Sequence, residues 1–307
     1  MISYIVKRLA IAIPTLLLLI IVSFLLMHAA PGGPFTQERA LPPQVLANLE
    51  AKYGLDQPLW RQMVNYVWGI VAHFDFGPSF IYKDRSVNQI IAQGFPVTLT
   101  YGAISFAVAV IVGVTLGVAA AIRHNSWLDY LAVGVSIGAQ VLPNFVMAPI
   151  LVLVFTLWLR WLPGGGWEGG QWEYIVMPVI ALSTSFMASI ARITRSSMLE
   201  VLNSNHIRTA RAKGLPERKV ILRHALKPAM LPVISYLGPA FVTMITGSVV
   251  VDIYFSTGGI GKAFVDSALN RDYAVMMGVT ILVGALTILF NLVVDILYAW
   301  IDPKIRY

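Results

Sequence analysis

Charged residues are scarce in this sequence of 307 residues, and cysteine is absent. Only 12% of the residues are Asp, Glu, Lys or Arg, which is about half of the usual share in a soluble domain. Because 57% of the residues are hydrophobic, too few polar side chains remain to cover a core in water. The lack of cysteine excludes a disulfide-stabilised secreted scaffold. This composition also excludes a disordered chain and indicates an integral membrane protein.

Six long runs in the sequence contain no charged residue. They cover residues 9–27, 97–122, 130–159, 174–191, 229–251 and 274–294. A helix needs roughly 20 apolar residues to cross the hydrocarbon core, and it satisfies its own backbone hydrogen bonds in lipid. The third run contains Pro143 and Pro149, so we expect one kinked or tilted helix there rather than two spans. The sequence predicts an all-α integral membrane protein with six transmembrane helices.

The first run also permits a second interpretation, a cleaved signal peptide, because Lys7 and Arg8 precede it. Its apolar stretch exceeds the roughly 7–15 residues of a signal sequence. Residues 27–29 also make a poor cleavage site. We therefore expect the first helix to remain in the protein.

The basic residues are unevenly distributed among the connections. If the N-terminus is cytoplasmic, 14 of the 22 basic residues face the cytoplasm, nine of them between residues 192 and 227. The inner segments then carry a net charge of +10 and the outer segments −2, and Asp295, which directly follows the last uncharged run, is counted within the last span. An excess of Lys and Arg marks the cytoplasmic side, so both termini are predicted to be cytoplasmic. The net charge of +7 therefore reflects topology and not affinity for nucleic acid.

An extracytoplasmic insertion separates the first two predicted spans. Ser86 and Gln89 have capping-box spacing, so we expect a short helix after Ser86. Two interpretations stay open for the insertion: helices anchored at the outer membrane interface, or a surface that docks an external partner. An earlier amphipathic helix is predicted by Trp60, Met63, Val64, Val67, Trp68 and Val71. The expected divisions of the chain are residues 1–29, 30–96 and 97–307, with a long cytoplasmic loop at 192–228.

The cytoplasmic loop has the pattern of two short helices joined by a turn. Residues 203–205 offer Asn and Ser side chains that can cap a helix, and residues 206–213 can form about two turns of it. Gly214 stands where a left-handed residue would end this helix, and a basic helix is expected to restart at residues 217–226. The segment has few apolar residues of its own to bury. Because so short a helix is marginal in water, we expect a partner surface, with anionic lipid headgroups as the alternative.

Two stretches of this loop carry a family resemblance. Residues 208–215 are Arg-Thr-Ala-Arg-Ala-Lys-Gly-Leu, and residues 223–228 are Arg-His-Ala-Leu-Lys-Pro. Together they resemble the EAA-type loop of importer permeases in the ATP-binding-cassette class, and more narrowly its oligopeptide and dipeptide branch. Arg208 replaces the glutamate of the general pattern and His224 replaces an isoleucine, and both departures are typical of the peptide branch. They put in doubt only a role that rests on the charge of that glutamate.

The resemblance extends over nearly the whole chain. Segments similar to the B-type inner-membrane subunit of oligopeptide permeases lie at residues 31–35, 53–58, 74–79, 162–166 and 302–307. The resemblance implies a half-channel in a bacterial inner membrane that pairs with a homologous C-type permease. It also implies two cytoplasmic ATPases and an extracytoplasmic peptide-binding protein. No cofactor is then expected on this chain, because ATP and Mg²⁺ belong to the partner ATPases.

By the same resemblance, the short cytoplasmic helix is moved when the two ATPases close on ATP. The residues that it assigns to this role are Asn205, His206, Arg208, Thr209, Ala210, Arg211, Ala212, Lys213, Gly214 and Leu215. The expected cargo is oligopeptides. Permeases for dipeptides, nickel chelates and glycan-derived peptides resemble one another in the same loops and stay open as alternatives. A self-sufficient secondary transporter or channel would predict inverted repeats or charged spans, and the sequence has neither.

The sequence contains no phosphate-binding loop of the P-loop type. The nearest candidate is the segment 258–262, which ends in Gly-Lys. A P-loop needs glycine five residues before its second glycine and Ser or Thr after the lysine, and Ser256 and Ala263 occupy these positions. The energy for transport must then come from another polypeptide. The segment itself is expected to be a gate or docking loop on the outer side, or a plain tight turn.

Groups that catalysis requires are also missing from the predicted spans. The sequence contains no HExxH motif, and its GxSxG pattern at residues 134–138 lies inside a predicted apolar span and not on a strand-to-helix turn, so we expect a non-catalytic subunit. Asp295 is the one ionisable residue within a predicted span, and both a structural ion pair and a role in coupling or proton movement stay open for it. The candidates for a pathway or gate are Gln140, Asn144, Thr246, Asn291, Gly258, Gly259 and Gly261.

Two Gly-x-x-x-Gly motifs permit close approach of helices. The first consists of Gly113 and Gly117, and the second of Gly134 and Gly138. Each motif is expected to mark a helix contact, either within this chain or against its partner.

Overall fold

A computed structural model describes residues 2–29, 35, 42–246 and 249–301, and it describes their side chains except at 2–9, 295 and 297–301. Within these residues the chain is helical apart from its turns and one isolated β-bridge between Pro78 and Ser86. The helices in chain order are α1 (Ile2–Ala29), α2 (Pro43–Tyr53), α3 (Leu59–His73), α4 (Val87–Ile122), α5 (Trp127–Val141), α6 (Asn144–Leu151), η1 (Val152–Trp158), η2 (Glu168–Gly170), α7 (Trp172–Leu202), α8 (Asn205–Ala212), α9 (Glu217–Lys219), η3 (Val220–Ala225), α10 (Leu226–Ile245), α11 (Val249–Tyr254), α12 (Ile260–Leu269) and α13 (Tyr273–Ile301).

Five helical stretches in the described chain are long and apolar enough to cross a membrane. They lie in α1, α4, α7, Glu217–Tyr254 and α13, and a bent pair of helices, α5 with α6 and η1, supplies a sixth span if it is counted as one. The predicted all-α membrane class is confirmed. The predicted number of six spans is reached only with the bent pair.

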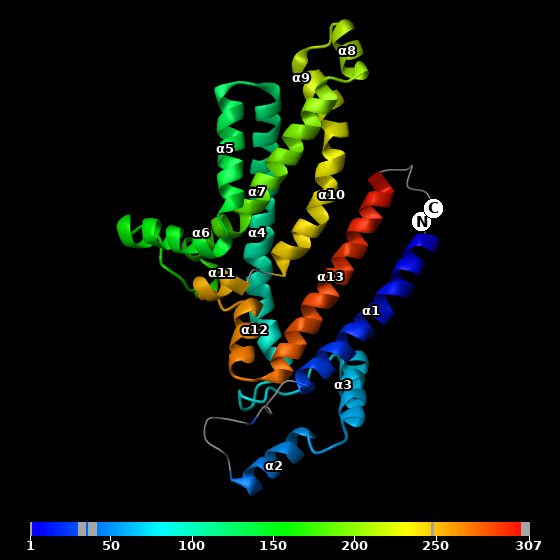
Figure 1. Cartoon of the computed structure of the whole chain (residues 1–307), viewed down its shortest axis with the longest axis vertical. Helices are drawn as coiled ribbons and strands as arrows, with labels where there is room; N and C mark the ends of the chain where they lie inside the picture. Colours follow the sequence, from blue (N-terminus) through cyan, green and yellow to red (C-terminus); the bar gives the residue numbers. More distant parts are fainter. Residues whose placement is uncertain (1, 30–34, 36–41, 247–248, 302–307) are drawn as a thin grey trace. The chain divides into compact units, whose positions relative to one another are not determined.

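The third predicted span is not one continuous helix. The axes of α5 and of the following α6–η1 segment differ by 103°, and Figure 1 shows the turn between them. Leu142 has an extended backbone (φ −81°, ψ 108°) directly before Pro143. Because a proline ring disfavours the helical conformation of the preceding residue, the chain breaks here instead of kinking. The expectation of a single kinked or tilted helix is therefore wrong.

The expected short helix after Ser86 does not end before the second span. Its predicted capping box is present: the Ser86 N–H donates to Gln89 Oε1 over 3.1 Å, and the Gln89 N–H donates to Ser86 Oγ over 3.2 Å. The helix that begins there is α4, which continues through Pro96 to Ile122. The insertion and the second span thus share one helix, and the expected division at residue 96 falls inside it.

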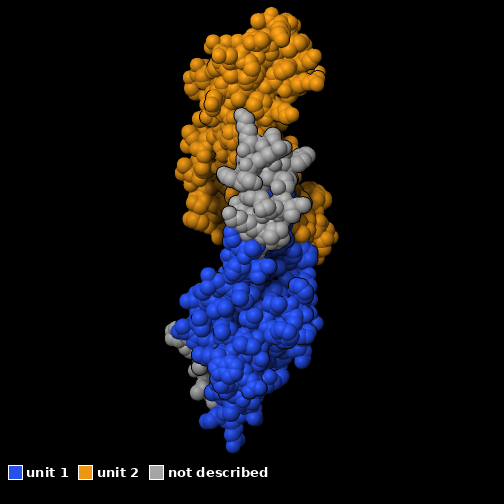
Figure 2. Space-filling model, turned by 90° about the vertical axis from the view of Figure 1, so that its right-hand side faces the viewer, with its two compact units in different colours: residues 1–98, 258–307 blue, residues 99–257 orange. Residues whose placement is uncertain are grey.

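The described chain separates into two compact units, unit 1 (residues 1–98 and 258–307) and unit 2 (residues 99–257), which are coloured in Figure 2. In unit 1, α1 packs along α13, and α3 and α12 also contact this pair. One apolar cluster joins Ile20 and Phe24 of α1 to Met277 and Ile281 of α13. Met63, Tyr66, Val67 and Ile70 of α3 cover this cluster, so the insertion helix is packed against two candidate spans.

Asp272 fixes the loop that precedes α4 onto the start of α13. Its carboxylate is fully buried and accepts hydrogen bonds from the Ser79 hydroxyl and from the Phe80 N–H, the latter over 3.2 Å. It also accepts from the Val275 N–H over 3.3 Å, which satisfies a donor in the first turn of α13. This carboxylate therefore holds two segments of unit 1 that are distant in sequence.

In unit 2, α7 packs against α5, α6 and α10. The first glycine motif brings α4 onto α7 as well. A methyl group at Gly113 would lie 2.8 Å from the Met187 carbonyl oxygen, and one at Gly117 would lie 2.5 Å from that of Ala191. No atom of the described chain lies within 4 Å of the same position at Gly134 or Gly138. The first motif is thus a contact within this chain, and the second faces open space.

Candidate functional site

The predicted coupling segment forms a short helix at one end of unit 2. Helix α8 follows α7 and precedes α9, and Figure 1 shows it beyond the ends of α5 and α10. Gly214 adopts the left-handed conformation, with φ +73°. Its N–H donates to the Arg211 carbonyl over 2.9 Å, and the Leu215 N–H reaches the Ala210 carbonyl over 3.4 Å. The expected helix and its glycine stop are confirmed, because a residue with a β-carbon is strained at this φ.

The side chains expected to cap α8 bond elsewhere. Ser204 is the N-cap residue, but its hydroxyl donates to the Val201 carbonyl over 2.5 Å. The Asn203 side chain donates to the Leu199 carbonyl over 2.9 Å. Both groups satisfy carbonyls at the end of α7, which also need partners. The prediction that they cap α8 is wrong, since the close end of α7 competes for the same side chains.

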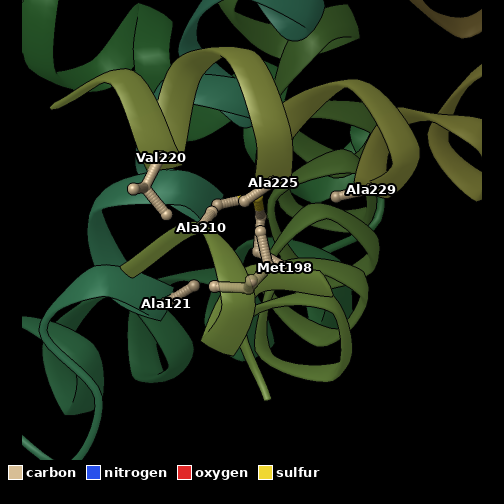
Figure 3. Packing of buried hydrophobic residues seen from close by; sticks show 7 residues of the cluster. Ala121, Met198, Ala210, Val220, Ala225 and Ala229 are labelled. Carbon is tan, nitrogen blue, oxygen red and sulfur yellow. The ribbon is translucent and has the colours of Figure 1, made fainter. Parts of the chain in front are cut away.

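Two apolar residues anchor α8 on its own chain. Ile207 is 0% exposed and Ala210 is 7% exposed, and their spacing of three places them on one face of the helix. They belong to one cluster with Met198 of α7, Val220 and Ala225 of η3, Ala121 of α4 and Ala229 of α10. Figure 3 labels these five residues together with Ala210. Unit 2 therefore supplies the surface that this short helix needs. The apolar face is thus buried within this chain, and a partner or lipid headgroups on the exposed face stay a prediction.

The remaining face of α8 is exposed and basic. Leu215, after the helix, is half-buried against the same cluster. Ile207 and Ala210 form the buried face of α8, whereas Arg208 and Arg211 lie on its exposed face. The exposed members of the predicted coupling set are Asn205, His206, Arg208, Thr209, Arg211, Ala212, Lys213 and Gly214.

An ion pair spans the turn that follows α8. Arg211 Nη2 lies 2.6 Å from Glu217 Oε1, and Nε lies 3.2 Å from Oε2. Both side chains are exposed, and the neighbouring carboxylate raises the pKa of Arg211 above its ordinary value. An exposed pair contributes little to stability, but the two-point geometry restricts the orientation of α8 relative to α9.

A π-helical segment links this turn to a candidate span. Helix α9 passes into η3 and then directly into α10, so helical structure is unbroken from Glu217 to Ile245. The sequence predicted the restart at Glu217 but an end near Leu226, and it carried no signal for the π geometry. Long π segments are rare and often occur at functional positions. The turn after α8 is thus joined to α10 by a helical segment that departs from α geometry.

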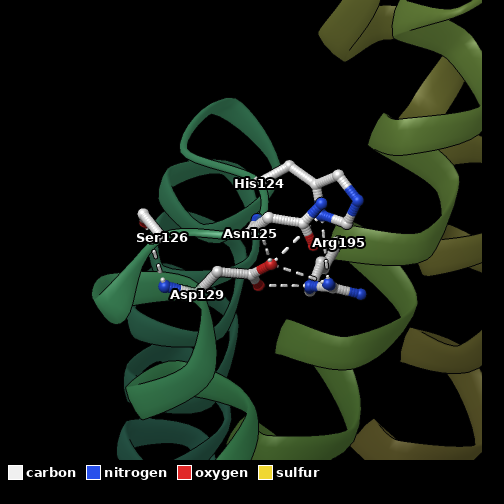
Figure 4. Close-up of polar contacts among 5 residues, drawn as sticks. All are labelled: His124, Asn125, Ser126, Asp129 and Arg195. Atoms are coloured by element: carbon white, nitrogen blue, oxygen red, sulfur yellow. Dashed lines mark hydrogen bonds and ion pairs between the residues drawn. The ribbon is translucent and has the colours of Figure 1, made fainter.

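A buried ion pair ties α7 to the turn between α4 and α5 (Figure 4). Arg195 Nε and Nη2 lie 2.5 Å and 2.8 Å from the two carboxylate oxygens of Asp129. The same carboxylate accepts from the Asn125 N–H over 3.0 Å and lies 3.1 Å from His124 Nδ1. The sequence interpretation counted Asp129 and Arg195 only as loop charges. The spacing of Ser126 and Asp129, whose N–H donates to the serine hydroxyl, is a capping pattern that would have marked this turn.

A second buried carboxylate was also missed. Asp252 is 0% exposed and accepts hydrogen bonds from the Tyr101 hydroxyl, over 2.9 Å, and from the Thr257 hydroxyl. It joins α4 to α11 within unit 2. It lies one residue beyond the fifth uncharged run, where the sequence treated it as an outer loop charge.

The segment 258–262 leads into α12, which begins at Ile260, and it packs on α4. Gly258 is exposed with φ +77°, whereas Gly259 and Gly261 are buried. The Ile260 N–H donates to Thr98 Oγ1 over 3.0 Å, and a methyl group at Gly94 would lie 3.2 Å from the Gly259 carbonyl carbon. A gating role for the glycines stays a prediction.

The other pathway candidates are distributed over both units. In unit 2, Gln140 is exposed, Asn144 is half-buried, and the Thr246 hydroxyl donates to the Val242 carbonyl of its own helix. Asn291, in unit 1, is exposed on α13. The side chain of Asp295 lies outside the described residues. Within the described chain, no three His, Asp or Glu side chains gather in a way that could hold a metal ion.

Comparisons with known proteins place these features in a family context. Residues 113–307 match the family described as "Binding-protein-dependent transport system inner membrane component", and residues 1–102 match its N-terminal companion. The chain is 58% identical to the oligopeptide transport system permease protein OppB of Salmonella typhimurium over 307 residues, the full length of both. It is 42% identical to the dipeptide transport system permease protein DppB of Bacillus subtilis, over 100% of this chain and 98% of that one.

A solved structure with the same fold is the inward-facing MetNI methionine ABC transporter. The alignment has a TM-score of 0.60 at 15% identity and covers 70% of this chain and 97% of that chain.

Proposed function

The chain belongs to the family of inner-membrane components of binding-protein-dependent transport systems, and we propose that it is the multi-pass permease subunit of an oligopeptide importer. The assignment to oligopeptides is supported by the 58% identity to an oligopeptide permease, against 42% to a dipeptide permease. Permeases for dipeptides, nickel chelates and glycan-derived peptides are the alternative cargo classes. A self-sufficient transporter or channel would be an outlier in this family.

Helix α8 receives the mechanical input in this proposal. The carrying observation is that Ile207 and Ala210 fix α8 into a buried cluster while its basic face stays exposed. Because the cluster contains residues of α4, α7, η3 and α10, a push on α8 moves several candidate spans together. The exposed cations Arg208, Arg211 and Lys213 suit an acidic groove on a partner. We assign this end of unit 2 to the cytoplasm, as the excess of Lys and Arg requires.

The energy source and the rest of the pathway lie on other chains. Two cytoplasmic ATPases supply the stroke and hold ATP and Mg²⁺, so this chain is non-catalytic. A homologous permease completes the pathway, and an extracytoplasmic binding protein delivers the peptide. This chain lines the pathway with the polar residues Gln140, Asn144, Thr246 and Asn291.

A copurification experiment tests the assembly. The tagged chain is extracted in mild detergent, and the proteins recovered with it are identified by mass spectrometry. A second permease and P-loop ATPases are expected. A chain that emerges alone and still moves solute across liposomes would contradict the proposal. Cargo is tested separately by measuring whether the chain and its neighbours restore tripeptide uptake to a bacterium that lacks its own peptide permeases.

A further inference from the structure

Unit 1 contains a cavity of about 430 Å³. Its walls come from the end of α1, the turn between α2 and α3, one face of α3, the loop at residues 75–80 and the start of α13. Cavities of roughly 300–1,000 Å³ suit ligands of small-molecule size. All of the lining residues belong to unit 1, and none of them is in the predicted coupling or pathway sets.

The charged and amide groups in this cavity favour a positively charged ligand. Glu50 and Asp75 contribute carboxylates, and the described lining contains no Lys or Arg. One carboxylate oxygen of Asp75 accepts from the Gly77 N–H over 2.9 Å, whereas Glu50 has no cationic partner in the part of the chain that the structure describes. The Asn65 side-chain amide donates to Gln57 Oε1 over 3.3 Å, which leaves the Asn65 carbonyl oxygen as an acceptor.

A buried hydroxyl group in the lining has no partner. Tyr66 Oη is buried, and no described group forms a hydrogen bond with it. Burial raises the pKa of this phenol above its ordinary value, so the group stays neutral and keeps both a donor and two acceptor lone pairs. Buried hydroxyls are normally paired. Because its oxygen has almost no accessible surface, an occupant of the cavity reaches the ring of Tyr66 and not its hydroxyl.

Aromatic rings form much of the remaining wall. They include Phe24, Tyr53, Phe76, Phe80 and Tyr273. Aromatic faces attract ammonium groups, and their edges and faces also pack against apolar side chains. The cavity therefore combines acceptors for a cation with an apolar enclosure.

We propose that this cavity binds the amino-terminal end of a peptide, with its ammonium group at Glu50 and its first side chain among the aromatic rings. An ammonium group has three donors, and the Glu50 carboxylate and the Asn65 carbonyl oxygen provide acceptors for them. The inference rests on the proposed function, which makes peptides the cargo. It adds a recognition subsite on this chain itself, separate from any binding protein.

Binding to the full-length chain tests the subsite directly. The chain, with the subunits that copurify, is placed in phosphatidylcholine nanodiscs without a binding protein. Titration calorimetry then compares the tripeptide Ala-Phe-Ala with N-acetyl-Ala-Phe-Ala. The free peptide is expected to bind at least about tenfold more tightly, because acetylation removes the charge and two donors. Equal affinities, or no binding of the free peptide, would overturn the inference.

Three variants refine the test. Glu50→Gln is expected to weaken binding of the free peptide about tenfold, whereas Tyr66→Phe, which removes a hydroxyl that does not face the cavity, should leave the affinity unchanged. Tyr66→Phe should leave the melting temperature unchanged or higher, since it removes an unpaired buried hydroxyl. Asp56→Asn is the matched control, because Asp56 is exposed in the same turn but does not line the cavity. A loss of binding in the control equal to that of Glu50→Gln would contradict the assignment.

A lipid headgroup is the other source of an ammonium group. Nanodiscs that contain phosphatidylethanolamine separate the two sources, because a lipid occupant would abolish peptide binding there, and that result would overturn the inference. Uptake in cells distinguishes the subsite from the wider function. Normal uptake by the unaltered chain with undiminished uptake by Glu50→Gln would refute the subsite alone. Failure of the unaltered chain to restore uptake would refute the proposed function.

Discussion

Arg195 of α7 and Asp129 of α5 form a two-point ion pair in which the carboxylate is 1% exposed. The same carboxylate accepts a hydrogen bond from the Asn125 backbone N–H and contacts His124. Asp129 of α5 is thus in contact with two residues of the preceding turn and with Arg195 of α7. A buried charge keeps its place only while its partners remain. The pair therefore fixes the turn between α4 and α5 against α7, the helix that leads into α8.

Removal of the Arg195 guanidinium group from this pair should destabilise the protein. Arg195→Met leaves a buried carboxylate without its counter-ion, and such a loss typically costs about 3–5 kcal/mol. The lower end is expected here, because the Arg195 side chain is 25% exposed. Thermal melting of the purified protein measures the effect. Arg211→Met is the matched control: it breaks an exposed pair and should leave the melting temperature nearly unchanged. Equal shifts for the two variants would contradict the structural role of Asp129.

Replacement of Gly117 by alanine should weaken the contact between α4 and α7. The added methyl group would lie 2.5 Å from the Ala191 carbonyl oxygen, which forces the helices apart, and such overpacking typically costs about 1–3 kcal/mol. Gly138→Ala is the control, since nothing lies within 4 Å of that position. Melting temperature and expression level in membranes report the difference. A Gly117 variant as stable as the Gly138 variant would show that the close contact does not form.

The placement of the spans was predictable because hydropathy is a local property, whereas the prolines show where local reasoning fails. Pro96 lies inside α4, and Pro143 lies at a 103° bend. Both prolines occur in apolar surroundings, so the sequence assigns them similar effects. The difference lies in packing: residues before Pro96 cover the cluster around Val87 and Ile260, and the helix continues through this proline. Contacts of this kind join positions far apart in the chain.

For α8 too, the sequence predicted the local structure but not the contacts with distant parts of the chain. Its length and its stop at Gly214 follow from local residue preferences, and both were predicted. Its anchoring was not, because Ile207 and Ala210 meet Ala121, Met198 and Ala229, and a short basic segment carries no signal for such distant partners. Asp129 and Asp252 were missed for a related reason, since a charge at the edge of an apolar run appears to be a loop charge until its partner is known.

A change of Gly214 to valine should uncouple transport without preventing membrane insertion. The backbone at φ +73° disfavours a residue with a branched β-carbon, at a cost of about 1–3 kcal/mol. No atom lies within 4 Å of the added carbon, so the effect is on the turn and not on packing. Peptide uptake and stimulated ATP hydrolysis should fall together. Gly214→Asn, which tolerates this conformation, should retain most of both activities, and full activity in the valine variant would contradict the role of the turn.

A substitution on the buried face of α8 should affect stability, whereas one on its exposed face should affect coupling to the ATPases. Ile207→Ala removes fully buried side-chain volume and should lower stability by about 2–5 kcal/mol. Arg208→Ala alters only the exposed face, so the melting temperature should stay the same while ATP hydrolysis stimulated by the peptide-loaded binding protein declines. Both quantities are measured on the purified assembly. An Arg208 variant with normal stimulation would remove that residue from the proposed contact with the ATPase.

Labelling of introduced cysteines tests the orientation of the chain without interference, because the chain contains no native cysteine. Lys83 and Arg208 are both exposed, and the distribution of Lys and Arg assigns them to opposite sides of the membrane. Lys83→Cys should react with an impermeant maleimide on intact cells, and Arg208→Cys only in inside-out vesicles. Ile207→Cys supplies the accessibility control, since this fully buried position should stay unlabelled from both sides until the protein is denatured. The opposite pattern for Lys83 and Arg208 would place α8 outside the cell, where no ATPase could reach it, and the proposed coupling would fail with the topology.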